Sequence, residues 1–187
     1  MYIFLAIIIL LFLGFFYIRN KIVKHENATK RAWADVTSFE RQKVKILDDL
    51  EPLIGRYSQF EQGTLSQITA LRQNILNLPH DAQNVRQLED IEQQTAQLLQ
   101  GIHVQIEAYP ELKASEIYQQ VMQEITDQNA NVGAAINIFN RNVEQFNNTI
   151  QIFPNNIVNT MSLSRKPLRP FKDQVQQNFD YRPNFHL

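Results

Sequence analysis

Residues 1–18 of this chain read MYIFLAIIILLFLGFFYI and contain no charged side chain. Eighteen residues of α-helix extend roughly 27 Å, close to the hydrocarbon thickness of about 30 Å that a membrane-spanning helix must cross. Tyr2 lies near one end of the stretch, and Phe15, Phe16 and Tyr17 lie near the other, at the headgroup levels that aromatic rings favour. The stretch therefore predicts one transmembrane helix over residues 1–18.

A cleaved secretory signal peptide is the alternative reading of this stretch. Such a peptide begins with a positively charged region and ends at a cleavage site of small residues. Neither feature occurs before Arg19, so the sequence favours an uncleaved membrane anchor. The chain also has no cysteine, which excludes a disulfide framework and a lipid-modified cysteine.

The charges that follow the apolar stretch predict its orientation. Glu26 is the single acidic residue within a basic flank made of Arg19, Lys21, Lys24, Lys30 and Arg31. The positive-inside rule then places the N-terminus outside and the rest of the chain in the cytoplasm. The same cations are suited to contact anionic lipid headgroups. A periplasmic or extracellular body remains the alternative topology.

Composition favours helices and gives no reason to expect a nucleic-acid partner. The 187 residues include 18 Lys and Arg against 19 Asp and Glu, a net charge of −1, so the whole chain does not attract polyanions. Only 5 Gly and 7 Pro occur, and they leave long windows without a helix breaker.

Apolar residues recur at three- and four-residue intervals in four windows, residues 19–57, 60–78, 81–106 and 115–153. Pro52 should bend or loosen the end of the first window, and Asp81 and Ser115 are suited to cap the third and fourth helices. The last window has the most regular apolar seam, formed by Ile117, Val121, Ile125, Val132, Ile136, Phe139, Val143, Phe146, Ile150 and Phe153.

These windows predict an all-α fold. We expect the transmembrane helix to continue without a break into the first window, and the long first and last helices to pair in an elongated antiparallel bundle. The predicted parts are a transmembrane helix (1–18), a helical bundle (19–154) and an irregular, proline-containing C-terminal tail (155–187). The tail carries a basic group that could contact lipid headgroups or remain solvated, namely Arg165, Lys166, Arg169 and Lys172.

The sequence contains no pattern typical of catalysis, cofactor binding or metal binding. The four histidines fall in separate segments, and no phosphate-binding loop or nucleophile motif occurs. The acidic runs at 48–51 and 89–92 are typical of solvated helix faces. We therefore expect no enzyme activity, no cofactor and no metal. Gly133, Ala134 and Ala135 form a small-residue patch where another helix could approach closely, although such a patch is more often ordinary packing.

Several blocks of this chain resemble successive motifs of the LemA family. They are residues 32–36 (AWADV), 50–54 (LEPLI) with Tyr57 and Glu61, Arg72, residues 107–114 (EAYPELKA), and the two Phe-Asn blocks that start at Phe139 and Phe146 and end at Phe153-Pro154. The resemblance implies a bacterial membrane protein with one N-terminal span and a helical-bundle body. It implies no established catalytic residue.

Two functional hypotheses follow. The first is a membrane-anchored scaffold or adaptor without catalysis, whose coiled-coil-like helices self-associate or bind another envelope protein at the bacterial inner membrane. The alternative is a module that senses anionic lipid or envelope stress through the basic flank and the basic tail group. The expected partners are membrane lipid, further copies of the chain and a second membrane protein.

Overall fold

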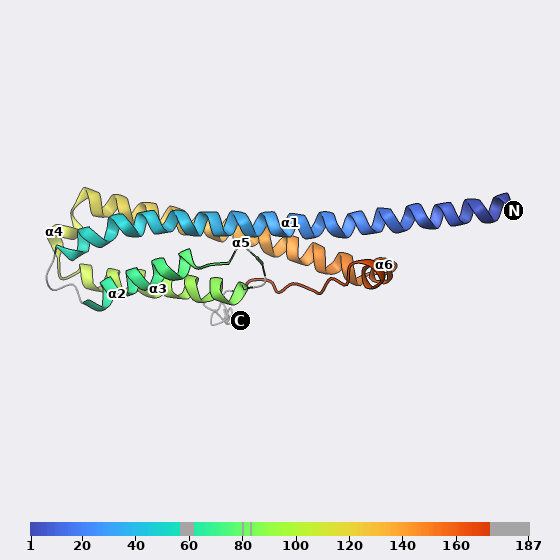
Figure 1. Cartoon of the computed structure of the whole chain (residues 1–187). Coiled ribbons are helices and arrows are strands. Elements are labelled where there is room, and N and C mark those ends of the chain that lie inside the picture. The colour runs from blue at the N-terminus through green and yellow to red at the C-terminus, as the bar shows by residue number, and fades with distance from the viewer. Residues whose placement is uncertain (57–61, 80, 83, 173–187) are drawn as a thin grey trace, which may run out of the picture. The chain divides into compact units, whose positions relative to one another are not determined.

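The computed structural model describes residues 1–56, 62–79, 81–82 and 84–172. Within these residues the chain forms helices and no strands, which confirms the all-α prediction (Figure 1). The helices are α1 (Tyr2–Gly55), α2 (Gln62–Leu76), α3 (Val85–Ile106), α4 (Pro110–Lys113), α5 (Glu116–Gln151) and α6 (Asn155–Ser162).

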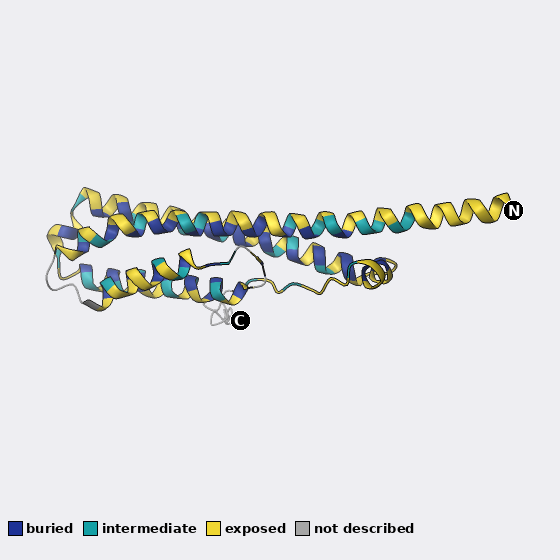
Figure 2. Ribbon diagram, in the orientation of Figure 1, coloured by how far each residue is buried: buried dark blue, intermediate teal, exposed yellow. Residues whose placement is uncertain are grey.

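Helix α1 is continuous over 54 residues, as predicted, and joins the apolar stretch to the residues that follow it. Pro52 lies within its last turn, and α1 ends three residues later, at Gly55. The first thirteen residues of the chain are exposed, and Ile22 is the first buried residue along α1 (Figure 2).

One face of α1 is buried at alternating intervals of four and three residues, the spacing of a coiled-coil seam. Most residues on this face are apolar, but four of them are polar or charged. The seam consists of Ile22, Glu26, Thr29, Trp33, Val36, Glu40, Lys43, Leu47, Leu50 and Ile54.

The chain divides into two compact units, and both α1 and α5 contribute to each of them. Among the described residues, the first unit contains Met1–Val36, residues 81–82 and Val132–Pro170. The second contains residues 37–56, 62–79, Asn84–Asn131 and 171–172.

In the first unit, α1 and α5 pair in antiparallel directions. The Thr29 hydroxyl donates to the Asn142 carbonyl at 3.2 Å, and the Trp33 ring lies 5.2 Å from the Phe139 ring, centroid to centroid. Moving forward along α1 therefore corresponds to moving backward along α5. Further along, an apolar cluster joins Ile22, Phe146 and Ile150 with the partly buried Ile18, Leu163 and Leu168.

In the second unit, helices α1, α2, α3 and α5 are linked by polar contacts. Asn74 of α2 donates to the Gln94 side chain of α3 at 2.8 Å, and Thr64 donates to Gln105 at 3.0 Å, so α2 and α3 are antiparallel. The Gln128 amide of α5 donates to the α1 carbonyl of Phe39 at 2.6 Å. The predicted pairing of the first and last long helices is thus present in both units.

Three residues near helix ends differ from their predicted roles. Helix α3 begins at Val85, with Asn84 as its N-cap residue, so Asp81 does not cap it. Ile117 is exposed because the first turn of α5 directs the neighbouring Tyr118 inward. Phe153 is exposed because α5 ends at Gln151, before the predicted seam is complete.

Two short helices were not predicted. Helix α4 has Pro110 in its first turn, where proline lacks only an amide that would be unpaired anyway. Helix α6 follows Pro154 directly, in a segment that the sequence predicts to be irregular. The restricted φ of proline suits the residue that precedes or starts a helix.

Candidate functional site

The apolar start of α1 is the one stretch in the described part of the chain that is long and apolar enough to cross a membrane. Its most apolar 18-residue window has a mean hydropathy of 2.4 and buries none of its residues. The basic flank follows it, and its exposed members are Lys21, Lys24, Lys30 and Arg31, with Arg19 partly exposed. The pKa of His25 is lowered, mainly by burial and to a smaller extent by the positive charges of Lys21 and Lys24.

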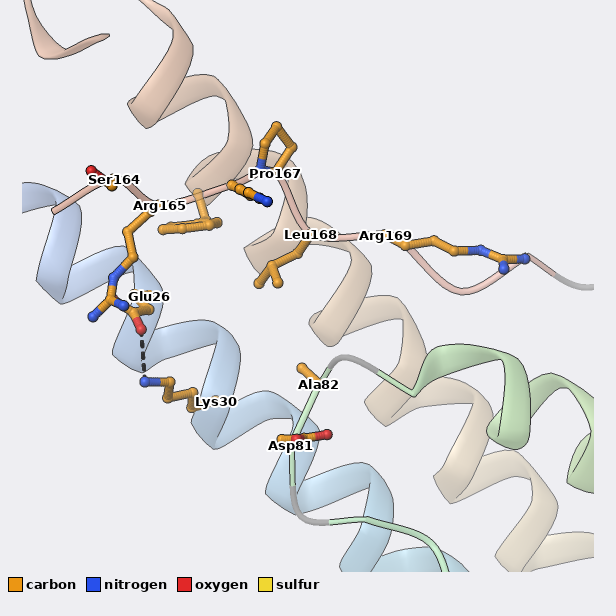
Figure 3. Close-up of a pocket in the computed structure, with 11 residues that line it drawn as sticks. Glu26, Lys30, Asp81, Ala82, Ser164, Arg165, Pro167, Leu168 and Arg169 are labelled. Carbon is orange, nitrogen blue, oxygen red and sulfur yellow. Dashed lines mark ion pairs between the residues drawn. The ribbon is translucent and has the colours of Figure 1, made fainter. Parts of the chain in front are cut away.

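Glu26 brings the basic flank and the basic tail group together. Its side chain is 11% exposed and lies on the seam of α1. Lys30 Nζ lies 2.7 Å from one carboxylate oxygen, and Arg165 Nε lies 2.9 Å from the other. Figure 3 shows Lys30 and Arg165 approaching this carboxylate from α1 and from the C-terminal segment. Two cations that the sequence places far apart therefore share one carboxylate.

A pocket of about 710 Å³ adjoins this ion-pair cluster in the first unit (Figure 3). Its wall is both charged and apolar, so it could accommodate a group that is partly anionic and partly apolar. Arg165 and Lys30 are already paired with Glu26, which reduces the positive charge available to such a group. The lining residues are Glu26, Lys30, Asp81, Ala82, Phe146 and residues 164–169.

The C-terminal segment is held in place by side-chain hydrogen bonds. Asn159 of α6 donates to the Arg165 carbonyl at 2.9 Å and accepts from the Arg165 amide at 3.0 Å. Asn147 of α5 makes the same pair of bonds with Leu168, each at 2.8 Å. Within the second unit, the Lys172 amide donates to Glu89 at 3.0 Å. The described part of the predicted tail is therefore ordered along the helices.

A buried charge cluster in the second unit consists of Glu40, Lys43 and Glu92. Lys43 Nζ lies 2.8 Å from Glu92 Oε1, and 3.2 and 3.4 Å from the two carboxylate oxygens of Glu40. The side chains of Glu40 and Lys43 are fully buried, and that of Glu92 is 26% exposed. Two carboxylates thus compete for one buried ammonium group, which lies closer to Glu92.

The protonation of this cluster follows from its burial. Burial raises the pKa of Glu40 to about 8, with Lys43 opposing the shift and the Glu92 carboxylate adding to it. Burial lowers the pKa of Lys43, but the two carboxylates outweigh that effect and the net direction is upward. A charged Lys43 paired with Glu92, beside a protonated Glu40, leaves no net charge in the buried site.

Sequence reasoning missed Glu40 and Lys43, although the sequence holds a signal for them. Charged residues on amphipathic helices usually lie on the solvated face. The alternating spacing from Trp33 through Val36 to Leu47, however, places both residues on the buried seam. If the four- and three-residue spacing is continued regardless of charge, it places Glu40 and Lys43 on the buried face and so predicts the cluster.

The other acidic and histidine candidates form no ligand site in the described residues. Asp48 and Glu51, from the first acidic run, both pair with Arg72, and Glu51 does so at 2.7 Å. No group of three or more His, Asp or Glu side chains that could hold a metal ion occurs in the described ranges. Two of the four histidines, His80 and His186, lie outside those ranges.

Within the described residues, the small-residue patch makes no close contact with another helix at Gly133. A β-carbon added there would meet no atom of another segment within 4 Å. Ala134 is exposed and Ala135 is buried, so the three residues do not share one face. The patch remains a prediction for contact with another chain.

A second, smaller pocket of about 320 Å³ lies in the second unit. Tyr118 lines it, and burial raises the pKa of this tyrosine, whose hydroxyl has no hydrogen-bond partner in the described structure. His103 and the exposed Lys113–Glu107 ion pair, 2.7 Å long, lie at the same pocket.

The chain is thus an all-helical protein whose first helix joins a stretch that could cross a membrane to a helical body. A family model described as the LemA family matches residues 32–180. Protein LemA of Metamycoplasma hominis is 30% identical over 161 residues, which cover 83% of this chain and 72% of that protein. The chain belongs to the LemA family, as the resemblance of its motifs predicted.

Proposed function

We propose that this protein is a single-pass, membrane-anchored scaffold or adaptor without catalytic activity, which acts by self-association or by binding another envelope protein. The observation that carries the proposal is the continuity of α1. The exposed apolar stretch and the buried seam that starts at Ile22 belong to one helix without a break. In such a helix, the position of the anchor in the membrane sets the position of the first unit, because the residues that pack in this unit are rigidly joined to the anchor.

The basic flank supports an orientation for this anchor. Positive charges gather immediately after the apolar stretch, and the positive-inside rule places that side in the cytoplasm of a bacterial inner membrane. Labelling of single cysteines in intact cells tests this orientation. A membrane-impermeant thiol reagent should modify a cysteine at Tyr2 and leave one at Ala130 unmodified, whereas the reverse pattern would establish the opposite topology.

The scaffold proposal can be tested by extracting the protein together with its surrounding lipid, without detergent, and measuring the native mass of the assembly. A large assembly of this chain alone, or a complex with a second protein at fixed stoichiometry, is the expected result. A monomer without a protein partner would refute the proposal.

The small-residue patch offers a more specific test. If helices approach at the patch, Gly133→Leu and Ala134→Leu should reduce the mass of the assembly or release the partner. Ala130→Leu is the matched control, because Ala130 is another exposed small residue of α5. Assembly that survives both patch variants would exclude the patch as the contact surface.

A second function, sensing of anionic lipid, is favoured by the convergence of Lys30 and Arg165 on Glu26 beside the larger pocket. Lipid phosphate that competed with Glu26 would loosen the segment that Asn159 holds. Hydrogen exchange of residues 164–169 should then be faster in phosphatidylglycerol bilayers than in phosphatidylcholine bilayers. Equal exchange in the two lipids would exclude this mechanism.

A further inference from the structure

Helix α6 buries two polar side chains and exposes two large apolar ones, which distinguishes it from an ordinary surface helix. Asn155, Val158 and Asn159, at the spacing of one helical face, are buried. Ile157 and Met161, four residues apart on another face, are 49% and 75% exposed. A surface helix of a water-soluble protein usually directs its apolar residues inward. The exposed apolar side chains of α6 are therefore better suited to an apolar environment than to water.

The apolar surface extends beyond α6 itself. Phe153, just before the helix, is 78% exposed, and the neighbouring Ile152 is 52% exposed. With Ile157 and Met161, these residues place four exposed large apolar side chains within ten residues of chain. We call this set of four residues the α6 apolar surface. Contiguous apolar surface of this kind usually marks a contact with a partner or a membrane.

The pairing of α1 with α5 places this surface level with the end of the apolar stretch. Thr29 contacts Asn142 across the antiparallel pair. Ile152 lies ten residues beyond Asn142 on α5, so its level on α1 is about ten residues before Thr29, at Arg19. The apolar cluster agrees with this register, because Ile18 and Leu163 pack against Ile22 and Ile150. Both ends of α6 are therefore anchored where the exposed apolar stretch of α1 meets its basic flank.

The orientation and charge of α6 fit a membrane surface. Figure 1 shows α6 lying across the direction of α1 rather than along it. A helix that crosses a membrane-spanning helix in this way lies in the plane of the bilayer. Exposed cations surround the same level, Lys21 and Lys24 on α1 and Lys166 just after α6. Interfacial helices combine an apolar face buried about 5–10 Å into the headgroup boundary with nearby cations that attract anionic lipids.

We propose that Ile152, Phe153, Ile157 and Met161 insert into the headgroup and upper acyl region of the bilayer that α1 spans, so that α6 is an interfacial membrane helix. The proposal rests on the membrane anchoring of α1 and is independent of which side of the membrane the body occupies. It gives the protein a second membrane contact, which fixes the tilt and rotation of the first unit against the bilayer.

Depth-dependent quenching in the full-length protein tests this proposal. The chain has no cysteine, so single variants can be labelled cleanly with an environment-sensitive fluorophore. The labelled variants are Ile157→Cys, Met161→Cys, Leu10→Cys and Ile138→Cys. Each is reconstituted in phosphatidylethanolamine–phosphatidylglycerol vesicles. The vesicles contain lipids that carry a nitroxide quencher either near the headgroup (shallow) or near the end of the acyl chain (deep). Ile138 is the matched control, since it is 51% exposed on α5 of the same unit but lies fourteen residues, roughly 21 Å, farther from the span.

The expected result is that shallow nitroxide lipids quench the labels at residues 157 and 161 several-fold more strongly than the label at residue 138, with emission shifted to shorter wavelength. Deep nitroxide lipids should quench the label at residue 10. If residue 10 is quenched and residues 157 and 161 behave like residue 138, the anchor stands and the proposal for α6 is wrong. A shifted emission at residues 157 and 161 without quenching by lipid would also overturn it, because a protein then covers the surface. If residue 10 is not quenched, the anchor itself is refuted.

Discussion

Replacing Glu40 with glutamine distinguishes two descriptions of the buried charge cluster. The two descriptions predict opposite changes in the free energy of unfolding near pH 8. If Glu40 is an ionised partner of Lys43, its removal leaves a buried charge short of a partner and should destabilise the protein by about 3–5 kcal/mol. If Glu40 is protonated, glutamine reproduces its shape and charge. The distances favour the second description, because Lys43 Nζ lies 2.8 Å from Glu92 and more than 3 Å from Glu40.

The raised pKa of Glu40 determines how the free energy of unfolding changes with pH, in both sign and size. Burial raises that pKa to about 8 from an ordinary value of 4.5. Between these two values the folded protein holds a proton on Glu40 that the unfolded chain has released, so the free energy of unfolding falls as pH rises, by about 1.4 kcal/mol per pH unit. Lys43, whose pKa is raised from 10.5, stays charged throughout this window. The wild-type chain should therefore lose roughly 3–5 kcal/mol between the two pKa values.

We expect Glu40→Gln to abolish this dependence on pH. Near pH 5 the variant and the wild type should unfold within about 1 kcal/mol of each other, and near pH 8 the variant should be the more stable by several kcal/mol. Guanidinium unfolding of the full-length protein in micelles, followed by far-ultraviolet circular dichroism, measures the difference. Infrared spectroscopy gives an independent readout, since the carbonyl stretch of a protonated carboxyl group should weaken as pH rises through about 8 in the wild type and be absent from the variant.

Two control variants separate this effect from general damage to the cluster. Glu92→Gln removes the shortest ion pair of Lys43 and should destabilise the protein at both pH values. Glu107→Gln breaks an ion pair whose two side chains are more than half exposed, and should cost less than about 1 kcal/mol. If Glu40→Gln instead destabilises the protein near pH 8 as strongly as Glu92→Gln does, Glu40 is ionised and our account of the cluster is refuted.

Three further substitutions test the packing of the first unit. Trp33→Ala removes a fully buried ring and should lower the free energy of unfolding by about 3–5 kcal/mol, measured by denaturation; a loss below 1 kcal/mol would contradict its place in the core. Thr29→Val deletes the hydroxyl that donates to Asn142 and should cost about 1 kcal/mol in the same assay, whereas an unchanged midpoint would make that bond irrelevant. Asn159→Ala frees the Arg165 backbone and should accelerate hydrogen exchange at residues 164–166 but not in α1; equal protection in the variant would show that another contact holds the segment.

The long helices were predictable because their signal is local. No glycine or proline lies between Gly14 and Pro52, and the apolar spacing persists through α1, so its continuity follows from the sequence. The pairing of α1 with α5 followed from their similar lengths, and the contact of Trp33 with Phe139 confirms it. The ends of α2, α3 and α5 differ from the prediction by a few residues, because end positions depend on individual capping contacts.

The features missed by sequence reasoning are those that depend on contacts between distant segments. Phe153 continues the apolar spacing of Ile150, and spacing alone cannot show that α5 ends between them. The residues of α6 have an amphipathic pattern, but pattern alone does not say which face is turned inward. The basic flank and the basic tail group were identified correctly as sequence features, whereas the sharing of Glu26 by Lys30 and Arg165 required the fold.

The buried charges of the second unit also bear on how α1 and α3 find a single alignment. A seam of leucine and isoleucine alone changes little when one helix slides past another by seven residues, because similar side chains meet again. Such a shift would move Glu92 about 10 Å along α3 and leave Lys43 buried without its closest carboxylate. A buried ammonium group that loses its partner costs several kcal/mol, more than most apolar rearrangements on this seam. Replacing buried ion pairs with well-packed apolar residues often leaves stability unchanged or raises it. We therefore infer that the main effect of the cluster is to penalise a shifted alignment of α1 and α3, in which Lys43 would lose Glu92.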